Sequence, residues 1–255
     1  MSRSNPTETL VNPAKLFIEW SGSEGKFKYY DKEKKENVFL DLPVKFIPLD
    51  RLSTVKGWSD AEKKGYWANE VRSTKDDVLT VRSKDGVELM AKYEVVKEKM
   101  SAKGVDYVQS LYAAMKIGKE LCIVNFQLKG SGLTPFIEFA KGKKIEEIGV
   151  QVLDTKPCKK GATKYFEPVY SIMDVSEATN KLATELDVEL QDYLNAYLAK
   201  NKSNVQQPTV TENQENGLNQ MQLPKSEAPA KVESDLSVPS GKVISALDEE
   251  DNLPF

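Results

Sequence analysis

Lysines alternate with aromatic residues in residues 26–30 of this chain, Lys-Phe-Lys-Tyr-Tyr. Successive side chains of an extended strand point to opposite faces, so Lys26, Lys28 and Tyr30 are expected to share one face. Ammonium groups attract phosphates, and flat aromatic rings stack on planar bases. The chemistry that these residues can do is therefore the binding of a polyanion that exposes its bases.

A second group of basic and aromatic residues follows in residues 51–72, a segment predicted as a loop. Trp58 and Trp67 are surrounded by Gly, Ser and Lys rather than by Val, Ile and Leu, so we predict that both are exposed. Three other aromatic residues are assigned to the core, because aromatic side chains dominate cores generally. These three are Phe17, Trp20 and Phe126.

Two further groups add polar side chains. Tyr112 and Lys116 share the face of their strand that lies opposite an apolar set, and Lys129 ends a polar row that begins at Asn125. Lysines also surround the turn at Gly161, which predicts a hairpin that contacts phosphates. The residues predicted to contact nucleic acid are Lys26, Lys28, Tyr30, Arg51, Lys56, Trp58, Lys63, Lys64, Trp67, Arg72, Tyr112, Lys116, Lys129, Lys159, Lys160 and Lys164.

The body that must position these residues has the pattern of β structure. Short runs rich in β-branched and aromatic residues are separated by turn sequences such as Ser-Glu-Gly and Lys-Asp-Gly. Short strands are predicted at 16–20, 26–30, 38–42, 44–48, 78–82 and 87–93. Longer strands are predicted at 107–117, 121–129, 149–156 and 164–173, with a short helix at 134–141 that has proline in its first turn.

The order of the later elements predicts the fold class. Strand, strand, helix, strand, strand fits the later part of a five-stranded Greek-key barrel of the oligonucleotide-binding (OB) type. We therefore expect a mainly β protein whose OB-fold-like domain covers residues 14–173, after a flexible N-terminus at 1–13. The stretch 44–106 is longer than a minimal barrel needs, and it is predicted to hold extra strands or a long loop.

Periodicity and composition predict the regions after the barrel. In residues 174–200, leucines and tyrosines recur every three or four positions, which predicts an amphipathic helix capped by Ser176. Packing of this helix on the body is favoured over a dimer contact. Residues 201–245 contain no aromatic residue and are rich in Asn, Gln, Ser, Thr and Pro, so we expect a disordered linker.

The last ten residues, 246–255, join a run of acids to an apolar tip. Apolar residues placed outside the charges do not help solubility, and proline limits the entropy lost when a pocket captures the tip. A plain solubilising tail is the alternative. We predict that the tip binds a partner protein through Asp248, Glu249, Glu250, Asp251, Leu253, Pro254 and Phe255.

This tip resembles the acidic tip of the single-stranded-DNA-binding proteins of bacteria and phages. The order of barrel, helix and acidic tail resembles the phage type, and residues 15–20 and 164–170 look similar to segments of such proteins. The resemblance implies a phage or prophage protein of the bacterial host cytoplasm that coats single-stranded DNA during replication, recombination or repair. It also implies that the tip recruits a polymerase, helicase or recombinase and competes with DNA for the basic groove.

Composition argues against several other classes of protein. The chain has no histidine and only two cysteines, so it can build neither a zinc site of four Cys or His ligands nor a histidine-based catalytic site. It also lacks a phosphate-binding loop motif. We expect no enzyme, cofactor or metal. No apolar run approaches the roughly 20 residues of a membrane span, and no signal peptide is predicted. We expect a soluble monomer or homodimer.

Charge is distributed unevenly along the chain. Residues 14–173 hold 29 Lys and Arg against 23 Asp and Glu, whereas residues 201–255 hold 4 against 9. A basic body and an acidic tail fit a DNA-binding groove with an internal competitor. Two alternatives stay open: a protein-interaction adaptor, and a barrel that binds single-stranded RNA, because lysines and aromatic residues do not separate RNA from DNA.

Overall fold

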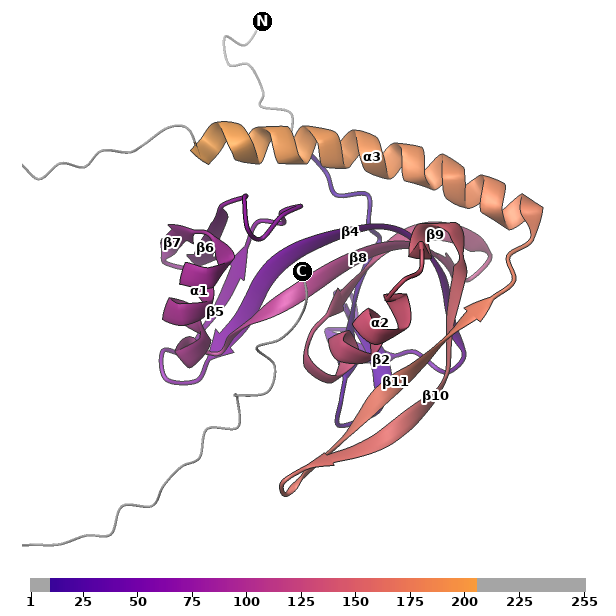
Figure 1. Ribbon diagram of the computed structural model, residues 1–255, viewed down its shortest axis with the longest axis horizontal. Coiled ribbons are helices and arrows are strands. Elements are labelled where there is room, and N and C mark those ends of the chain that lie inside the picture. The colour runs from indigo at the N-terminus through magenta and orange to yellow at the C-terminus, as the bar shows by residue number, and fades with distance from the viewer. Residues whose placement is uncertain (1–9, 206–255) are drawn as a thin grey trace, which may run out of the picture. The chain divides into compact units, whose positions relative to one another are not determined.

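The computed structural model describes residues 10–205 (Figure 1). The predicted tip at 246–255 and nearly all of the predicted linker at 201–245 lie outside the described residues. The strands are β1 (Leu16–Ser21), β2 (Lys26–Asp31), β3 (Glu36–Phe39), β4 (Val44–Ser59), β5 (Lys64–Ala68), β6 (Leu79–Ser83), β7 (Gly86–Ala91), β8 (Val105–Ile117), β9 (Glu120–Leu128), β10 (Gly149–Lys160) and β11 (Thr163–Met173). The helices are α1 (Tyr93–Met100), α2 (Leu133–Ala140) and α3 (Glu177–Val205), with short 3-10 turns η1 (Ser101–Lys103), η2 (Gly130–Gly132) and η3 (Ile145–Glu147).

All of these strands belong to one mixed, open sheet. Its order is β3-β2-β1-β9-β8-β4-β5-β6-β7, and β10 pairs with both β4 and β11. β1 runs parallel to β9, and the other ladders between the described strands are antiparallel. The prediction of a mainly β body followed by a C-terminal helix is confirmed.

Strand β4 has partners along both of its edges. One edge pairs with β8 from Phe46 to Gly57. The other edge pairs with β10 near the start of β4 and with β5 near its end. In Figure 1, β4 and β8 are the long strands that run from the β5-β6-β7 group to the strands around α2. These two strands therefore connect the two cores described below.

The larger core lies on one face of β1, β4, β8, β9 and β10, where α2 also packs. We call this face of the sheet the inner face and the opposite one the outer face. Phe126 is fully buried, and its ring lies 5.3 Å from Phe27 and 4.6 Å from Phe46, measured between ring centroids. Trp20 packs edge-on against Phe27 at 4.9 Å. Core positions for Trp20 and Phe126, predicted from the sequence, are confirmed.

A smaller core lies within residues 55–105. It contains Val55, Tyr66, Leu79 and Val96, all with 2% exposure or less. The prediction of a loop at 51–72 is wrong, because β4 continues to Ser59 and β5 follows it. The sequence also gave no sign of α1, whose eight residues offer only two buried side chains. The long stretch 44–106, which we call the insertion, is thus an ordered part of the structure that contributes strands β4 to β7 to the sheet.

Helix α3 lies against the outer face of the sheet, over β4, β8 and β9 (Figure 1). Leu190 and Leu194 are fully buried there, beside Leu52 and Ile123. As predicted, the Ser176 hydroxyl caps the start of the helix by accepting the Thr179 N–H at 3.2 Å. α3 therefore covers part of the outer face, and near its C-terminal end the Tyr197 hydroxyl accepts the Glu70 N–H at 2.9 Å.

No helix among the described residues combines the length and apolar character that crossing a membrane requires.

Truncating Leu190 should weaken the fold far more than truncating Leu182 on the same helix. Leu190 is 0% exposed and Leu182 is 51% exposed. Leu190→Ala should lower the free energy of unfolding by about 2 to 5 kcal/mol, because it leaves a cavity under α3. Leu182→Ala should change it by less than about 0.5 kcal/mol. Urea denaturation measures both, and similar small effects would show that α3 is not packed as described.

Candidate nucleic-acid interface

The registers of the sheet bring basic and aromatic side chains to one face. In antiparallel ladders, directly opposed residues share a face, and this relation joins Lys28 to Glu19 and Lys56 to Trp67. Glu19 also lies beside Gln127 in the parallel ladder between β1 and β9. The lysine-aromatic face, as we call it, consists of Phe17, Glu19, Lys28, Tyr30, Phe39, Lys56, Trp58, Trp67, Gln127 and Lys129.

Three lysines of this face surround one carboxylate. Lys56 Nζ lies 2.7 Å from Glu19 Oε1 and donates to Gln127 Oε1 at 2.8 Å. Burial alone would raise the pKa of Glu19, but the hydrogen bond from Lys56 and the charges of Lys56, Lys129 and Lys28 outweigh it and hold this pKa below its usual range. The face therefore carries three lysines whose charge acts on Glu19, and a second acid, Asp106, is directly opposed to Lys56 in the ladder between β4 and β8.

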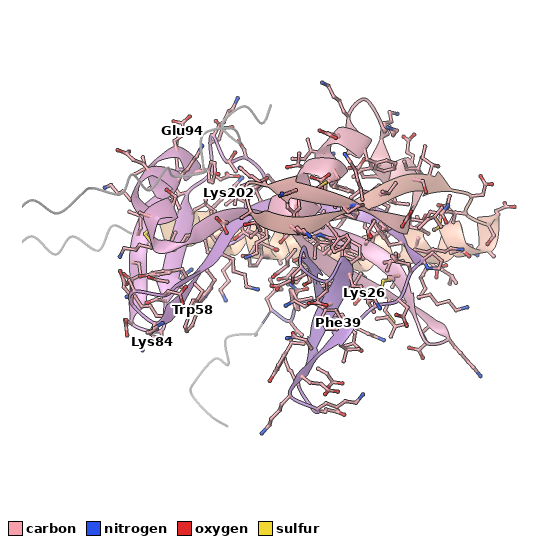
Figure 2. The ribbon with its side chains drawn as sticks, turned by 90° about the horizontal axis from the view of Figure 1, so that it is seen from below. Lys26, Phe39, Trp58, Lys84, Glu94 and Lys202 are labelled. Atoms are coloured by element: carbon pink, nitrogen blue, oxygen red, sulfur yellow. The ribbon has the colours of Figure 1, made fainter. Side chains whose placement is uncertain are left out.

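Five aromatic rings of the same face are open to solvent. Trp58 is 57% exposed, Tyr30 56%, Trp67 47%, Phe17 45% and Phe39 42%. Figure 2 shows Trp58 well apart from Phe39 and Lys26. Exposure of both tryptophans confirms the sequence prediction, whereas Phe17 was wrongly assigned to the core. Two features of the sequence indicate that Phe17 is exposed: it alternates with the apolar Ile18, and it lies on the same face of the strand as the charged Glu19.

A close approach of the backbone shapes the strand around Trp58. A Cβ on Gly57 would lie 1.9 Å from the carbonyl oxygen of Gly104, so only glycine fits there. Gly104 itself has a φ of 76°, which favours glycine. Opposite Trp58 in β5 stands Gly65, which leaves the indole ring uncovered on that side. Glycines at these positions let Trp58 project from a well-packed strand.

Tyr112 must be removed from the predicted contacts, because it is fully buried under α3. Its hydroxyl donates to Glu70 Oε2 at 2.7 Å and accepts a hydrogen bond from Asn12 Nδ2 at 3.1 Å. Burial and the nearby Glu70 raise the pKa of Tyr112 far above its usual range. Asn125, predicted to begin a polar groove, is also buried and donates to Glu70. Tyr112 and Asn125 therefore belong to the helix contact rather than to a groove, whereas Gln127 and Lys129 lie on the lysine-aromatic face.

Three of the predicted cations are held by nearby acids. The Lys64 side chain is 13% exposed and lies 2.7 Å from Glu88, with two further carboxylates within 3.3 Å. Arg72 forms a two-pronged ion pair with Asp50. Arg51 pairs with Glu146 at 3.1 Å, and its position in β4 places it on the face opposite to Lys56. None of the three belongs to the lysine-aromatic face.

The remaining predicted lysines lie at the surface. Lys26 pairs with Asp41 at 3.1 Å beside the face, and Lys63 stands in the β4-β5 turn, 3.6 Å from Asp60. Lys116 is exposed at the far end of β8. Three more lysines gather at the tip of the β10-β11 hairpin, where Lys159 is directly opposed to Lys164 and Lys160 borders the turn. The hairpin tip is thus strongly basic, as predicted.

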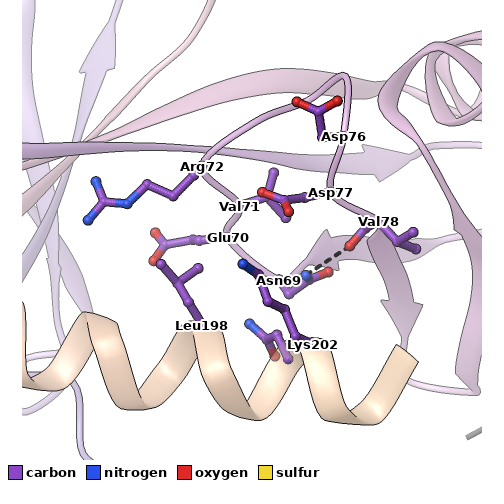
Figure 3. A pocket seen from close by; sticks show the side chains of 10 residues that line it. Asn69, Glu70, Val71, Arg72, Asp76, Asp77, Val78, Leu198 and Lys202 are labelled. Carbon is purple, nitrogen blue, oxygen red and sulfur yellow. Dashed lines mark hydrogen bonds between the residues drawn. The ribbon is translucent and has the colours of Figure 1, made fainter. Parts of the chain in front are cut away.

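A pocket of about 320 Å³ lies between α3 and the segment after β5 (Figure 3). Some of its polar side chains already serve local structure. Asn69 donates to the Val78 carbonyl oxygen at 3.2 Å and accepts the Thr80 N–H at 2.6 Å, while Asp77 accepts the Ser73 N–H. No group of three metal-ligating side chains occurs within residues 10–205. The pocket is therefore a weaker candidate site than the face.

Comparison of the chain with models of protein families, with curated proteins and with solved structures finds no match.

The ion pairs around Glu62 should make the insertion sensitive to acid. Hydrogen bonds from Lys103, Tyr66 and Lys64 lower the pKa of Glu62 from 4.5 to about 2. A depressed carboxyl pKa stabilises the fold above pH 4.5, and this contribution is lost as pH falls from 4.5 to 2. Wild type should therefore exceed Glu62→Gln in stability at pH 7, with the difference vanishing near pH 2 in urea titrations. A difference independent of pH would contradict this account.

Proposed function

We propose that this protein binds single-stranded DNA without reading its sequence. The observation that carries the proposal is the lysine-aromatic face, where exposed rings and clustered lysines occupy one side of a continuous sheet. Binding of this kind needs cations for the phosphates and rings for the exposed bases. Base-paired DNA hides the faces of its bases, so stacking favours single strands. The proposed role is non-catalytic.

The order of the strands supports this proposal. Strands β4, β8, β9 and β10 lie in the order β10-β4-β8-β9, which is the Greek-key order 4-1-2-3, and α2 lies between β9 and β10 in sequence. Strand β11 then pairs with β10, as the fifth strand of an OB fold would. The fold we propose is an OB-like barrel with β1 added beside β9.

The closure between β11 and β1 is also consistent with such a barrel. The Phe166 N–H donates to the Gly22 carbonyl oxygen at 2.8 Å, and Trp20 Nε1 donates to the Phe166 carbonyl oxygen at 3.0 Å. These bonds join the two ends of the strand order β1-β9-β8-β4-β10-β11 without forming a ladder. A ring of strands with one loosely bonded seam is the shape of a partly open barrel.

The positions of the candidate residues agree with this correspondence. OB folds bind oligonucleotides on the face of their second and third strands and on the loops between strands 1 and 2 and strands 4 and 5. In this correspondence β9 is the third strand, and it contains Gln127 and ends just before Lys129. The connection between strands 1 and 2 is the segment from β4 to β8, which contains Trp67. The connection between strands 4 and 5 is the basic tip of the β10-β11 hairpin. Surfaces that are distant in sequence thus correspond to one binding region.

The acidic C-terminal segment completes the proposal. Its tip, residues 246–255, would recruit a polymerase, helicase or recombinase of the bacterial host or phage, and it would occupy the basic face when DNA is absent. Binding linkage must be reciprocal, so a partner that captures the tip would tighten DNA binding. The setting we propose is a phage or prophage protein in the cytoplasm of the bacterial host.

Removing one exposed tryptophan should weaken the binding of single-stranded DNA. Each stacked base contributes about 1 to 3 kcal/mol, so Trp58→Ala and Trp67→Ala should each lower affinity by roughly 5-fold to 150-fold. Leu153→Ala is the matched control, because Leu153 is 53% exposed on β10 outside the face. Fluorescence anisotropy of a labelled oligonucleotide measures the losses. Equal affinities for all three variants would contradict stacking on this face.

A chain that ends at Ser245 should bind single-stranded DNA more tightly than the full chain. The truncation removes the four acids that we propose compete for the lysine-aromatic face. Affinity of both chains should fall steeply with salt, since each neutralised phosphate of a single strand adds about 0.7 to the logarithmic salt slope. Anisotropy with single-stranded DNA, duplex DNA and single-stranded RNA provides the comparison. Unchanged affinity after truncation would refute the competition, and a preference for RNA would reassign the ligand.

A further inference from the structure

We propose that Glu19 occupies a phosphate subsite formed by Lys28, Lys56 and Lys129, and that a phosphate of the bound DNA displaces its carboxylate from Lys56. This inference rests on the proposed function and extends it, because it assigns a subsite and a built-in competitor to the face.

The geometry places Glu19 at the centre of the basic cluster. β1 lies between β2 and β9, so Glu19 has Lys28 directly opposite on one side and Gln127 beside it on the other. Lys56 belongs to β4, which is separated from β1 by β8 and β9. Its side chain nevertheless reaches Glu19, at 2.7 Å, instead of extending into solvent. The Glu19 carboxylate therefore lies close to lysines from two separate strands, Lys28 of β2 and Lys56 of β4.

A carboxylate and a phosphodiester offer the same kind of group to these lysines. Both present negatively charged oxygens that accept hydrogen bonds from ammonium groups, and charge-assisted bonds of this type are comparable for the two anions. Glu19 thus holds Lys56 where a phosphate oxygen can replace the carboxylate oxygen. Gln127 Oε1, at 2.8 Å from Lys56 Nζ, keeps the ammonium group in place during such an exchange.

The exposure of the pair makes the exchange feasible. The side chains of Lys56 and Glu19 are 45% and 34% exposed, and ion pairs open to solvent contribute little to stability. Lys64, by contrast, is 13% exposed among three carboxylates and belongs to the folded framework. The pair on the face can therefore open at small cost, whereas the Lys64 cluster has no such freedom.

As a consequence, Glu19 limits the affinity of the folded body for single-stranded DNA. With Glu19 in place, every DNA molecule that uses the subsite must first break the contact with Lys56. Removal of the acid frees Lys56 for phosphate, takes a negative charge away from Lys28 and Lys129, and tightens binding. A coating protein gains from this limit, because the DNA it covers must later be released.

Glu19→Gln tests the proposal in the full chain. It keeps the shape of the side chain and removes its charge, so affinity for a labelled single-stranded oligonucleotide should rise about threefold to tenfold. Glu146→Gln is the matched control: Glu146 is 41% exposed, pairs with Arg51 at 3.1 Å, and its partner lies on the opposite face of β4. This control removes the same charge and should change affinity by less than about twofold.

The labelling of Lys56 by an amine-reactive ester, read by mass spectrometry, gives a second measurement. In free protein, Glu19→Gln should increase the labelling of Lys56 severalfold and leave that of Lys159 unchanged. Bound DNA should protect Lys56 in wild type and variant alike. A Lys56 that stays reactive in the complex would show that no phosphate takes the place of Glu19.

The outcomes separate this inference from the proposed function. If wild type binds single-stranded DNA but Glu19→Gln binds no more tightly than Glu146→Gln, the subsite is wrong and the function stands. If neither wild type nor Glu19→Gln binds single-stranded DNA even at low salt, the proposed function fails and the subsite fails with it.

Discussion

The ladder between β4 and β8 is the interaction on which the rest of the described structure depends. It runs from Phe46 to Gly57 on β4 and is continuous except for one bulge. Its inner face supplies Phe46 and Leu111 to the main core, and its outer face supplies Leu52 to the contact with α3. Because side chains alternate along a strand, the same ladder also carries Lys56 and Trp58 to the uncovered end of the outer face.

Ion pairing divides the basic residues of the body into two groups. Lys64 and Arg72 form ion pairs with acids that the fold brings beside them, so their positive charges are neutralised within the protein. On the lysine-aromatic face, Lys28, Lys56 and Lys129 all lower the pKa of Glu19, and of the three Lys56 forms the ion pair with it. The net positive charge of residues 14–173 therefore does not make every lysine a candidate contact, because the placement of the acids decides which cations can meet a polyanion.

The outer face of the sheet is also divided, in this case by α3. Under the helix, the Tyr112 hydroxyl and the Asn125 amide group both donate to Glu70. Beyond the helix, the same face of β9 leads to Gln127 and Lys129, which contact or influence the Lys56 pair. One strand face thus serves packing at one end and, in our proposal, DNA at the other. The helix limits the length of strand that a ligand can reach.

The sequence by itself determined the local elements. Alternation of apolar and polar residues predicted the strands that became β8 and β9, and proline in the first turn predicted α2. The spacing of leucines and tyrosines, with Ser176 as cap, predicted α3. These signals depend on neighbours within a few positions of each other. Residues 51–72 showed no such period, and their strands form because β8 and a small core hold them.

Only the tertiary structure decided which polar faces stay open. Tyr112 and Phe17 both lie in alternating strands, yet α3 covers the first and leaves the second at 45% exposure. Lys56 and Arg72 look alike in sequence, and acids from distant segments, Glu19 and Asp50, determine the surroundings of each. Burial and charge pairing depend on residues far away in the chain, which is why residue types and spacing predicted the basic and aromatic character of this body but not the position of its face.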